Sequence, residues 1–487
     1  MSGKVRGALI WSFAERYASL VVTLASTMLL ARLLTPQEIG VFSVCAAFVT
    51  IATVLRDFGI SEYLIQEKQL DDEKLRAAYA GAIVIGWGVG AIAMLARHPL
   101  AVYLKEPAVV EVIGILALNF AILPFASPAF ALLNRNLQFR RIFVIQFSSS
   151  FVHAGTGVIL AMNGFGFRSL AWASVANTAF QALLLLVMRS PGTLLMPSFK
   201  GMRHVFGYGS YFVLSRLLET FTRNAHEFII ARSFGLTSVG LFSRALGLLE
   251  MFYSNVTSAV LRVATPVFAD QHRSGTDLSV TYAQSTALMT AIAWPFFGYV
   301  ALMSHDIMRL LLGPQWDAAA PICSLLALAI MPTYLYSFGP NLLNATGNVS
   351  KRLRINLIYS PVHLVVLVIA SRFNLETLAA SWVVSHLVAL SLYVYYMRTL
   401  LGASTRTLLG PSLKSALVAA GSIGPQALMA QAGHHYDWPL LVNLLTTGAA
   451  GLAGLVITAQ GLHHPLAIEL SRAFHGLRQR MTKRVAS

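Results

Sequence analysis

The chain has 487 residues, of which 56% are hydrophobic and only 11% are charged, and its formal net charge is +16. A soluble domain typically carries about 25% charged residues, so this composition excludes an ordinary soluble protein and indicates one that lies largely in lipid. The only two cysteines, Cys45 and Cys323, fall in separate apolar stretches, which excludes a disulfide framework and a cysteine-based metal site.

Apolar stretches long enough to cross a bilayer recur along the whole chain. A transmembrane helix needs about 20 such residues, and the sequence predicts an all-α integral membrane protein with fourteen spans. They cover residues 9–31, 37–56, 78–96, 109–133, 142–162, 168–188, 205–231, 237–260, 281–303, 318–344, 355–371, 376–397, 411–431 and 438–459. Merging 142–188 or dividing 318–344 changes the count, and twelve spans is the alternative. Pro332 and Pro340 predict a kink within 318–344.

The first predicted span carries a polar stripe. Lys4 and Arg6 precede a long apolar run without a small-residue cleavage site, which predicts a retained helix rather than a signal peptide. Polar residues then recur at spacings of three and four, namely Ser12, Glu15, Arg16, Ser19, Thr23 and Thr27. A charge in the middle of a span is costly, so we expect Glu15 and Arg16 to face a water-filled cavity or a charged partner.

A repeat follows this span. Residues 29–43 read LLARLLTPQEIGVFS, and residues 229–243 read IIARSFGLTSVGLFS. Five pairs are identical at this offset of 200, namely Ala31/Ala231, Arg32/Arg232, Gly40/Gly240, Phe42/Phe242 and Ser43/Ser243. Because six predicted spans separate the copies, both cross the membrane in the same direction, which indicates a parallel repeat of two six-helix lobes. We expect Gly40 and Gly240 to permit a close approach between helices.

The repeat predicts how the chain is divided. Residues 1–200 form an N-terminal lobe, 201–400 a C-terminal lobe, 401–460 two additional spans and 461–487 a basic cytoplasmic tail. In the tail, apolar residues at helical spacing lie among basic ones, which is typical of an amphipathic helix on the inner membrane surface. A disordered basic tail is the alternative.

The basic residues are distributed unevenly across the membrane. With the N-terminus inside, 25 of the 36 Lys and Arg residues fall in cytoplasmic segments, seven fall in outside loops and four lie within spans. This asymmetry follows the positive-inside rule and places both termini in the cytoplasm. It also accounts for the net charge of +16 without a polyanionic partner, so nucleic-acid binding is excluded.

Charges recur in the seventh predicted span, which carries Arg216, Glu219, Arg223, His226 and Glu227. Arg216 lies 200 positions after Arg16, so each lobe would present an arginine from an equivalent helix. Arginine stays charged in proteins, and its planar fork matches phosphate oxygens. We therefore expect a cationic cavity, lined by Arg16, Arg216 and Arg223, for a pyrophosphate or an acidic sugar. Arg244 in the next span is a further candidate.

The alternative is that these charges neutralise one another. Glu15 adjoins Arg16, and Glu219 precedes Arg223 by four residues, which is the favoured spacing for a helical ion pair. The same stripe would serve both purposes if a carboxylate released its arginine when a ligand or a coupling cation arrived.

Four carboxylates are candidates for a coupling-ion site or for charge partners, namely Glu15, Glu219, Glu227 and Asp57. Asp57 follows Arg56 at the end of a span, which favours a simple ion pair there. His434 and His435 fall in the last outside loop, where we interpret them as solvated. No nucleotide-binding, serine-hydrolase or zinc-helix motif is found, so we expect no enzyme, no cofactor and no metal site.

Several stretches resemble the Wzx-type flippases of lipid-linked oligosaccharides, which belong to the multidrug/oligosaccharidyl-lipid/polysaccharide (MOP) exporter superfamily. They are ARLLTPQEIGVFSV (31–44), DFGISEYLIQEKQLDDEKLRAA (57–78), GLTSVGLFSRALGL (235–248), LLGPQWDAAAPICSLLALA (311–329) and LLNATGNVSKRLRINL (342–357). They lie in both halves of the chain and most resemble the exopolysaccharide, colanic-acid-like branch.

The resemblance implies fourteen helices in two lobes that surround a cationic cavity and work by alternating access. As the substrate it implies a polyprenyl-pyrophosphate-linked oligosaccharide repeat unit, moved across the bacterial inner membrane for exopolysaccharide, O-antigen lipopolysaccharide or capsule synthesis. It further implies exchange of H⁺ or Na⁺, as proposed for some relatives, and polymerase or export machinery as partners. In this family cavity arginines lie on the first and seventh helices, a placement that Arg16, Arg216 and Arg223 match.

Three other functions stay open. A cation-coupled multidrug exporter would need carboxylates and aromatics for cationic drugs, whereas these stripes are rich in arginine. A flippase for the peptidoglycan precursor lipid would also need a cationic site for a pyrophosphate. A membrane-bound polysaccharide polymerase or ligase would resemble chains with a large outside loop, which this sequence does not predict.

Overall fold

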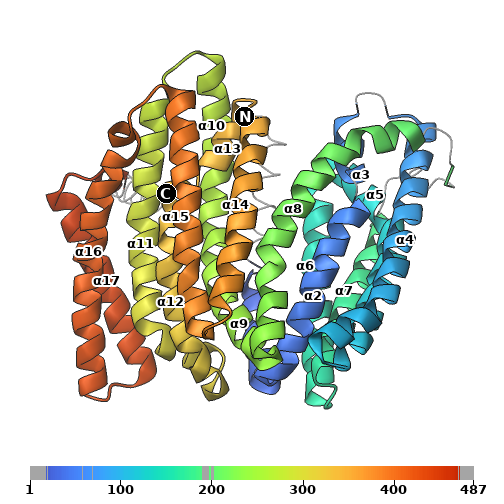
Figure 1. Cartoon of the computed structure of the whole chain (residues 1–487), viewed down its shortest axis with the longest axis horizontal. Coiled ribbons are helices and arrows are strands. Elements are labelled where there is room, and N and C mark those ends of the chain that lie inside the picture. The colour runs from blue at the N-terminus through green and yellow to red at the C-terminus, as the bar shows by residue number, and fades with distance from the viewer. Residues whose placement is uncertain are drawn as a thin grey trace, which may run out of the picture. The chain divides into compact units, whose positions relative to one another are not determined.

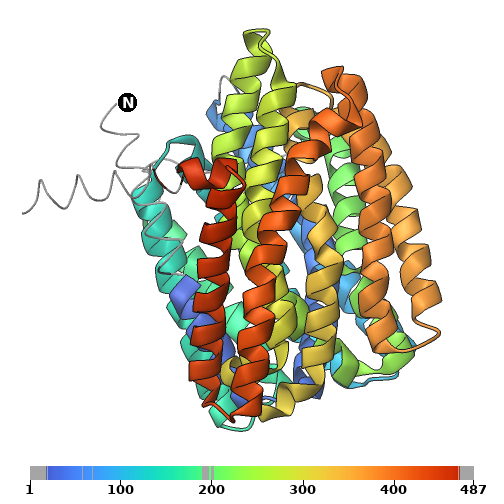
Figure 2. The same cartoon turned by 90° about the vertical axis from the view of Figure 1, so that its left-hand side faces the viewer.

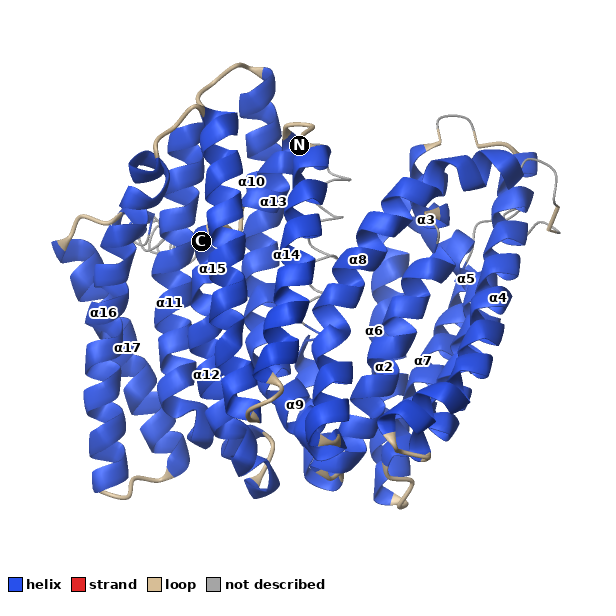
Figure 3. Ribbon diagram, in the orientation of Figure 1, coloured by secondary structure: helices blue, strands red, loops and turns tan. Residues whose placement is uncertain are grey.

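The computed structural model describes residues 18, 20–57, 59–67, 70–188, 197–198, 202–469 and 471. In addition to a helix at Leu20–Leu33, these residues form the sixteen α-helices α2 to α17, joined by short loops and interrupted by one π and two 3-10 segments. No strand occurs among the described residues (Figure 3). The predicted all-α class is therefore confirmed for this part of the chain.

The chain divides into two compact units, Met1–Ser243 and Arg244–Ser487. Besides an apolar helix at Leu20–Leu33, the first unit contains α2 (Pro36–Asp57), α3 (Ile60–Gln66), α4 (Asp72–Leu104), α5 (Ala108–Arg135), α6 (Phe139–Met162), α7 (Phe167–Met188), α8 (Met202–Phe234) and the start of α9 (Leu236–Phe252). Within this unit α4 packs against α5, α6 against α7, and α8 against α2 and α4. Figure 1 shows these helices from blue to green.

The second unit continues α9 and adds the rest of the chain. Its elements are the π segment η1 (Tyr253–Thr257), α10 (Ser258–Arg273), α11 (Leu278–Leu311), η2 (Pro314–Ala319), α12 (Ala320–Ile330), η3 (Met331–Leu335), α13 (Gly339–Ala345), α14 (Val349–Ala370), α15 (Leu375–Leu401), α16 (Thr405–His435) and α17 (Leu440–Gly461). α16 and α17 form an antiparallel hairpin, visible in red in Figures 1 and 2, and α16 packs along α11.

Ten segments of the described chain are long and apolar enough to cross a membrane. They are Pro36–Asp57, Asp72–Leu104, Ala108–Arg135, Phe139–Met162, Phe167–Met188, Leu278–Leu311, Pro314–Ala345, Val349–Ala370, Leu375–Leu401 and Leu440–Gly461. Each coincides with a predicted span. The other four predicted spans overlap the helix at Leu20–Leu33 and helices α8, α9 and α16, which are shorter or more polar. The count of fourteen therefore stays a prediction.

The repeated glycines bring the first turns of α2 and α9 together inside the first unit. A Cβ atom on Gly40 would lie 1.8 Å from the carbonyl oxygen of Leu236, and one on Gly240 would lie 1.9 Å from that of Pro36. Pro36 and Leu236 are themselves 200 positions apart, so the contact obeys the repeat. Only glycine leaves room for two backbones at this separation. The predicted close approach is confirmed.

Candidate functional site

Helix α8 carries the charged stripe of the seventh predicted span. Arg216 and Arg223 are both exposed, and their spacing of seven residues places them on one face, two turns apart. Thr222 and Ala225, which point away from these arginines, are buried, and α8 packs against α2 and α4 of the first unit. The helix therefore presents two permanently charged side chains on one exposed face.

Glu219 is the closest carboxylate partner of Arg223. Its Oε1 lies 4.0 Å from a terminal guanidinium nitrogen of Arg223, and the two side chains are 39% and 59% exposed. An ion pair this long and this exposed contributes little stability. The ion pair with Glu219 is therefore weak enough for the Arg223 guanidinium to exchange it for an anionic ligand.

Glu227 lies one turn further along α8 in a different setting. It is buried beside the buried ring of His226, and its Oε1 accepts a 2.7 Å hydrogen bond from the Ser243 hydroxyl on α9. Nε2 of His226 lies 3.6 Å from the same oxygen. Oε2 is buried without a hydrogen-bond partner among the described residues. A buried carboxyl oxygen without a hydrogen-bond partner is costly, so it can take a donor or a small cation as a ligand.

The other predicted site residues have separate surroundings. Asp57 forms an ion pair with its neighbour Arg56 at the end of α2. Arg244 is half-buried on α9, at the start of the second unit, and its role in a cavity stays a prediction. Glu15 and Arg16 lie outside the described residues.

A polar pocket of about 370 Å³ opens in the first unit where α9 begins. Its lining includes Lys105, Glu106 and Arg232. Lys105 adopts a left-handed backbone conformation at the end of α4, with φ of 57°. The guanidinium of Arg232 lies 5.9 Å from the centre of the Tyr103 ring. Arg232, one of the two repeated arginines, thus lies at the rim of this pocket.

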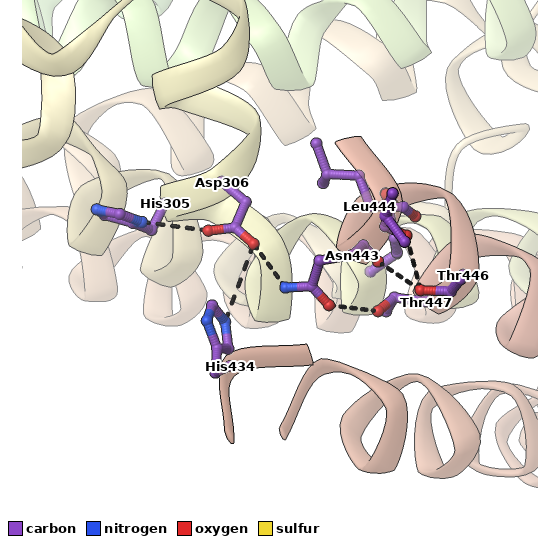
Figure 4. Close-up of polar contacts among 9 residues, drawn as sticks. His305, Asp306, His434, Asn443, Leu444, Thr446 and Thr447 are labelled. Atoms are coloured by element: carbon purple, nitrogen blue, oxygen red, sulfur yellow. Dashed lines mark hydrogen bonds and ion pairs between the residues drawn. The ribbon is translucent and has the colours of Figure 1, made fainter. Parts of the chain in front are cut away.

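The second unit contains a further set of buried polar residues, which the sequence patterns did not predict. Asp306 near the end of α11 is buried and accepts a hydrogen bond from the buried Asn443 of α17 (Figure 4). The available signal was a lone Asn in the apolar run PLLVNLLTTG (439–448), since a polar side chain in a span requires a partner. Within the part of the chain that the structure describes, no three or more His, Cys, Asp or Glu residues are arranged to hold a metal ion.

Ten apolar segments of spanning length in the described part of the chain define a multi-pass membrane protein. The sequence model of a family described as polysaccharide biosynthesis protein matches residues 29–321, which is more than half of the chain. The chain belongs to this family, which comprises membrane transporters rather than enzymes.

Two curated relatives are similar over much of the chain. The succinoglycan biosynthesis transport protein ExoT of Rhizobium meliloti is 25% identical over 328 residues, covering 66% of this chain and 65% of the relative. The lipopolysaccharide biosynthesis protein WzxC of Escherichia coli is 22% identical over 324 residues, covering 65% of each. The chain thus spans just under two thirds of the length of these relatives.

Solved structures share the fold. The lipid II flippase MurJ in an inward closed conformation matches with a TM-score of 0.73 at 12% identity, over 93% of this chain and 99% of that one. An inward-facing multidrug resistance transporter of the MATE family matches with a TM-score of 0.66 at 13% identity, over 79% and 94%. Both likenesses identify the fold of the MOP superfamily.

Proposed function

We propose that the protein is a flippase that moves polyprenyl-pyrophosphate-linked oligosaccharide repeat units across the bacterial inner membrane by alternating access. The product would feed exopolysaccharide, O-antigen or capsule synthesis. The observation that carries the proposal is the exposure of Arg216 and Arg223 on α8. A permanent charge at membrane depth requires water or an anion beside it, and a guanidinium suits a pyrophosphate. The family supplies the link to polysaccharide synthesis.

The proposal includes the remaining expectations from the sequence. Arg16 and Arg244 would complete the cationic cavity, and fourteen spans would form two six-helix lobes with both termini in the cytoplasm. Glu227 is the preferred coupling-ion residue because its second carboxyl oxygen is buried without a hydrogen-bond partner among the described residues. Glu219 would act as the charge partner that Arg223 exchanges for substrate.

The fold does not separate this function from its two neighbours in the superfamily. The similar structures include both a lipid II flippase and a multidrug transporter. At sequence identities of 12% and 13%, these similarities support a shared fold but not a shared cargo. The family match favours a polysaccharide precursor as cargo. Rescue of a strain depleted of its peptidoglycan precursor flippase would instead favour that lipid.

The deciding experiment uses a strain that lacks this gene. We expect complete lipid-linked repeat units to accumulate on the inner leaflet and the surface polysaccharide to be lost. Extraction of the lipid-linked oligosaccharides, with an enzymatic test of which leaflet holds them, measures both effects. Normal polysaccharide without accumulation would contradict the proposal.

Site variants then test the arginines in the complemented strain. A hydrogen bond to a charged group contributes about 1.5–3 kcal/mol, so Arg216→Gln and Arg223→Gln should each lower export about ten-fold or more at matched expression. Arg273→Gln is the matched control, because Arg273 is an exposed arginine paired with Asp270 at the end of α10. Export by Arg216→Gln and Arg223→Gln equal to that of the control would remove these residues from the site.

A further inference from the structure

The pocket of about 370 Å³ where α9 begins has a positive charge balance. Among the described residues that line it, Lys105 and Arg232 are positive and Glu106 is negative, and all belong to the first unit. Oε1 of Glu106 accepts a 3.3 Å hydrogen bond from the backbone N–H of Ala108, the first residue of α5. This carboxylate is therefore held at the start of another helix, and the two cationic side chains determine which ligand charge the pocket favours.

The two cations are positioned by their surroundings. Lys105 ends α4 with a φ of 57°, a left-handed conformation that glycine usually adopts at a helix end. A lysine in this costly conformation indicates a role for its side chain. The guanidinium of Arg232 lies over the Tyr103 ring, 5.9 Å from its centre, and this contact limits the positions that the guanidinium can adopt.

The start of α9 adds backbone donors, as a comparison of the two repeats shows. The first N–H groups of a helix have no partner within it. In the first copy Thr35 caps α2: its hydroxyl oxygen accepts a 3.3 Å hydrogen bond from the Glu38 N–H, and the Glu38 carboxylate accepts one from the Thr35 N–H over 2.8 Å. In the second copy Gly235 replaces Thr35 and has no side chain to cap α9. Because the start of α9 lines the pocket, its N–H groups support the two cations in binding an anion.

The pocket lies at the boundary of the membrane. Its lining includes Leu104, the last residue of α4, and Gln37, the second residue of α2, and both helices are apolar and of spanning length. Val102 and Tyr103, which precede Leu104, are 78% and 53% exposed. An exposed tyrosine at the end of a span is typical of the depth at which lipid headgroups lie. The pocket thus opens at headgroup level, with exposed apolar surface on its membrane side.

We propose that this pocket binds the phosphate group of an anionic phospholipid. Lys105 and Arg232 would contact the phosphodiester oxygens together with the N–H groups of α9, and the acyl chains would lie along Val102 and Tyr103. A zwitterionic phospholipid has the same phosphodiester, but its ammonium group is repelled by the two cations, so the pocket should prefer a lipid with a net negative charge. The binding of this lipid depends neither on the cargo of the transporter nor on its orientation.

The test uses the purified full-length protein in detergent micelles and a photoreactive analogue of phosphatidylglycerol. After illumination, mass spectrometry of the peptides should locate cross-links within residues 102–106 or 231–237. Unlabelled phosphatidylglycerol should compete with the analogue, whereas phosphatidylcholine should compete at least about fivefold more weakly. Cross-links that occur only elsewhere in the chain, or equal competition by the two lipids, would overturn the proposal. Competition by free glycerol phosphate as strong as that by phosphatidylglycerol would assign the pocket to a soluble phosphate ester and would overturn the lipid as its ligand.

Three variants make the result specific. Arg232→Gln and Lys105→Gly should each lower the cross-linking at these peptides about fivefold, because one basic residue near an anionic lipid is lost. Lys105→Gly also suits the left-handed backbone, so its thermal midpoint without added lipid should not fall, and a loss of binding in this variant cannot be ascribed to misfolding. Arg168→Gln is the matched control, since Arg168 is an exposed arginine that pairs with Glu111 and lies outside the pocket lining. Cross-linking by Lys105→Gly and Arg232→Gln equal to that of this control would also contradict the proposal.

Discussion

His464 is fully buried just after α17, and its contacts specify one protonation state. The backbone N–H of Leu466 donates to its Nδ1 over 3.1 Å, so this nitrogen carries no hydrogen. Its Nε2 then donates to the Ser415 hydroxyl of α16, 3.1 Å away, which in turn donates to the Ala287 carbonyl of α11 over 2.8 Å. This network requires a neutral ring, because a proton on Nδ1 would remove the acceptor of Leu466.

The pH dependence of stability follows from this arrangement. Burial, and secondly the positive charge of Lys414, lowers the pKa of His464 from its ordinary value of 6.5. The unfolded chain therefore binds the proton first, so the stabilisation is complete above about pH 6.5 and is lost as the pH falls toward the folded pKa. The thermal midpoint of the wild type should fall more steeply between about pH 7.5 and about pH 5.5 than that of His464→Asn. If the thermal midpoints of the wild type and of His464→Asn fell in parallel with pH, the His464 ring would not be held neutral.

Single residues were predictable where their neighbours in sequence were informative. Charges repeated along one helix, such as Arg216 and Arg223, predict an exposed polar stripe, and the structure exposes both. The pairing of Asp306 with Asn443 spans 137 positions, and no local pattern specifies which apolar helix supplies the partner. His434 was interpreted as solvated for the same reason; its ring is largely exposed but lies 3.9 Å from Asp306.

At the scale of helices, the repeated glycines allow a direct test of packing. Gly40→Ala would place a methyl group 1.8 Å from the backbone oxygen of Leu236, which cannot move without α9. Overpacking of this kind costs about 1–3 kcal/mol, so the thermal midpoint of the purified protein should fall. Gly247→Ala on α9 is the matched control, because its added Cβ meets nothing within 4 Å and alanine favours a helix. Equal midpoints in the two variants would argue against the close contact.

Hydropathy predicted most helices because a bilayer demands continuous apolar runs. It was weaker where function or packing adds polar groups. The charges of α8 reduce its apolar character while its helix runs unbroken from Met202 to Phe234. Helix α12 ends at Ile330, and Pro332 lies in the 3-10 segment Met331–Leu335 that follows it. The predicted kink in 318–344 is therefore confirmed. The π segment Tyr253–Thr257, which interrupts the predicted span 237–260, has no proline or glycine to signal it.

For the whole molecule, the uneven distribution of basic residues leads to a predicted orientation. If both termini are cytoplasmic, the turn between α14 and α15 faces outward and the turn between α10 and α11 faces inward. Phe373 and Ser274 are exposed in these two turns. Cys45 and Cys323 are buried, so the native thiols should react slowly, and a single introduced cysteine should report its own position.

We expect a membrane-impermeant maleimide to label Phe373→Cys in intact cells and to label Ser274→Cys only after the membrane is opened. Labelling of both variants in opened membranes is the control for accessibility. The orientation also decides which compartment sets the protonation of His464, which would be the cytoplasm because this residue follows the last helix. The opposite labelling pattern would reverse this assignment and would require the cargo to enter from the other leaflet.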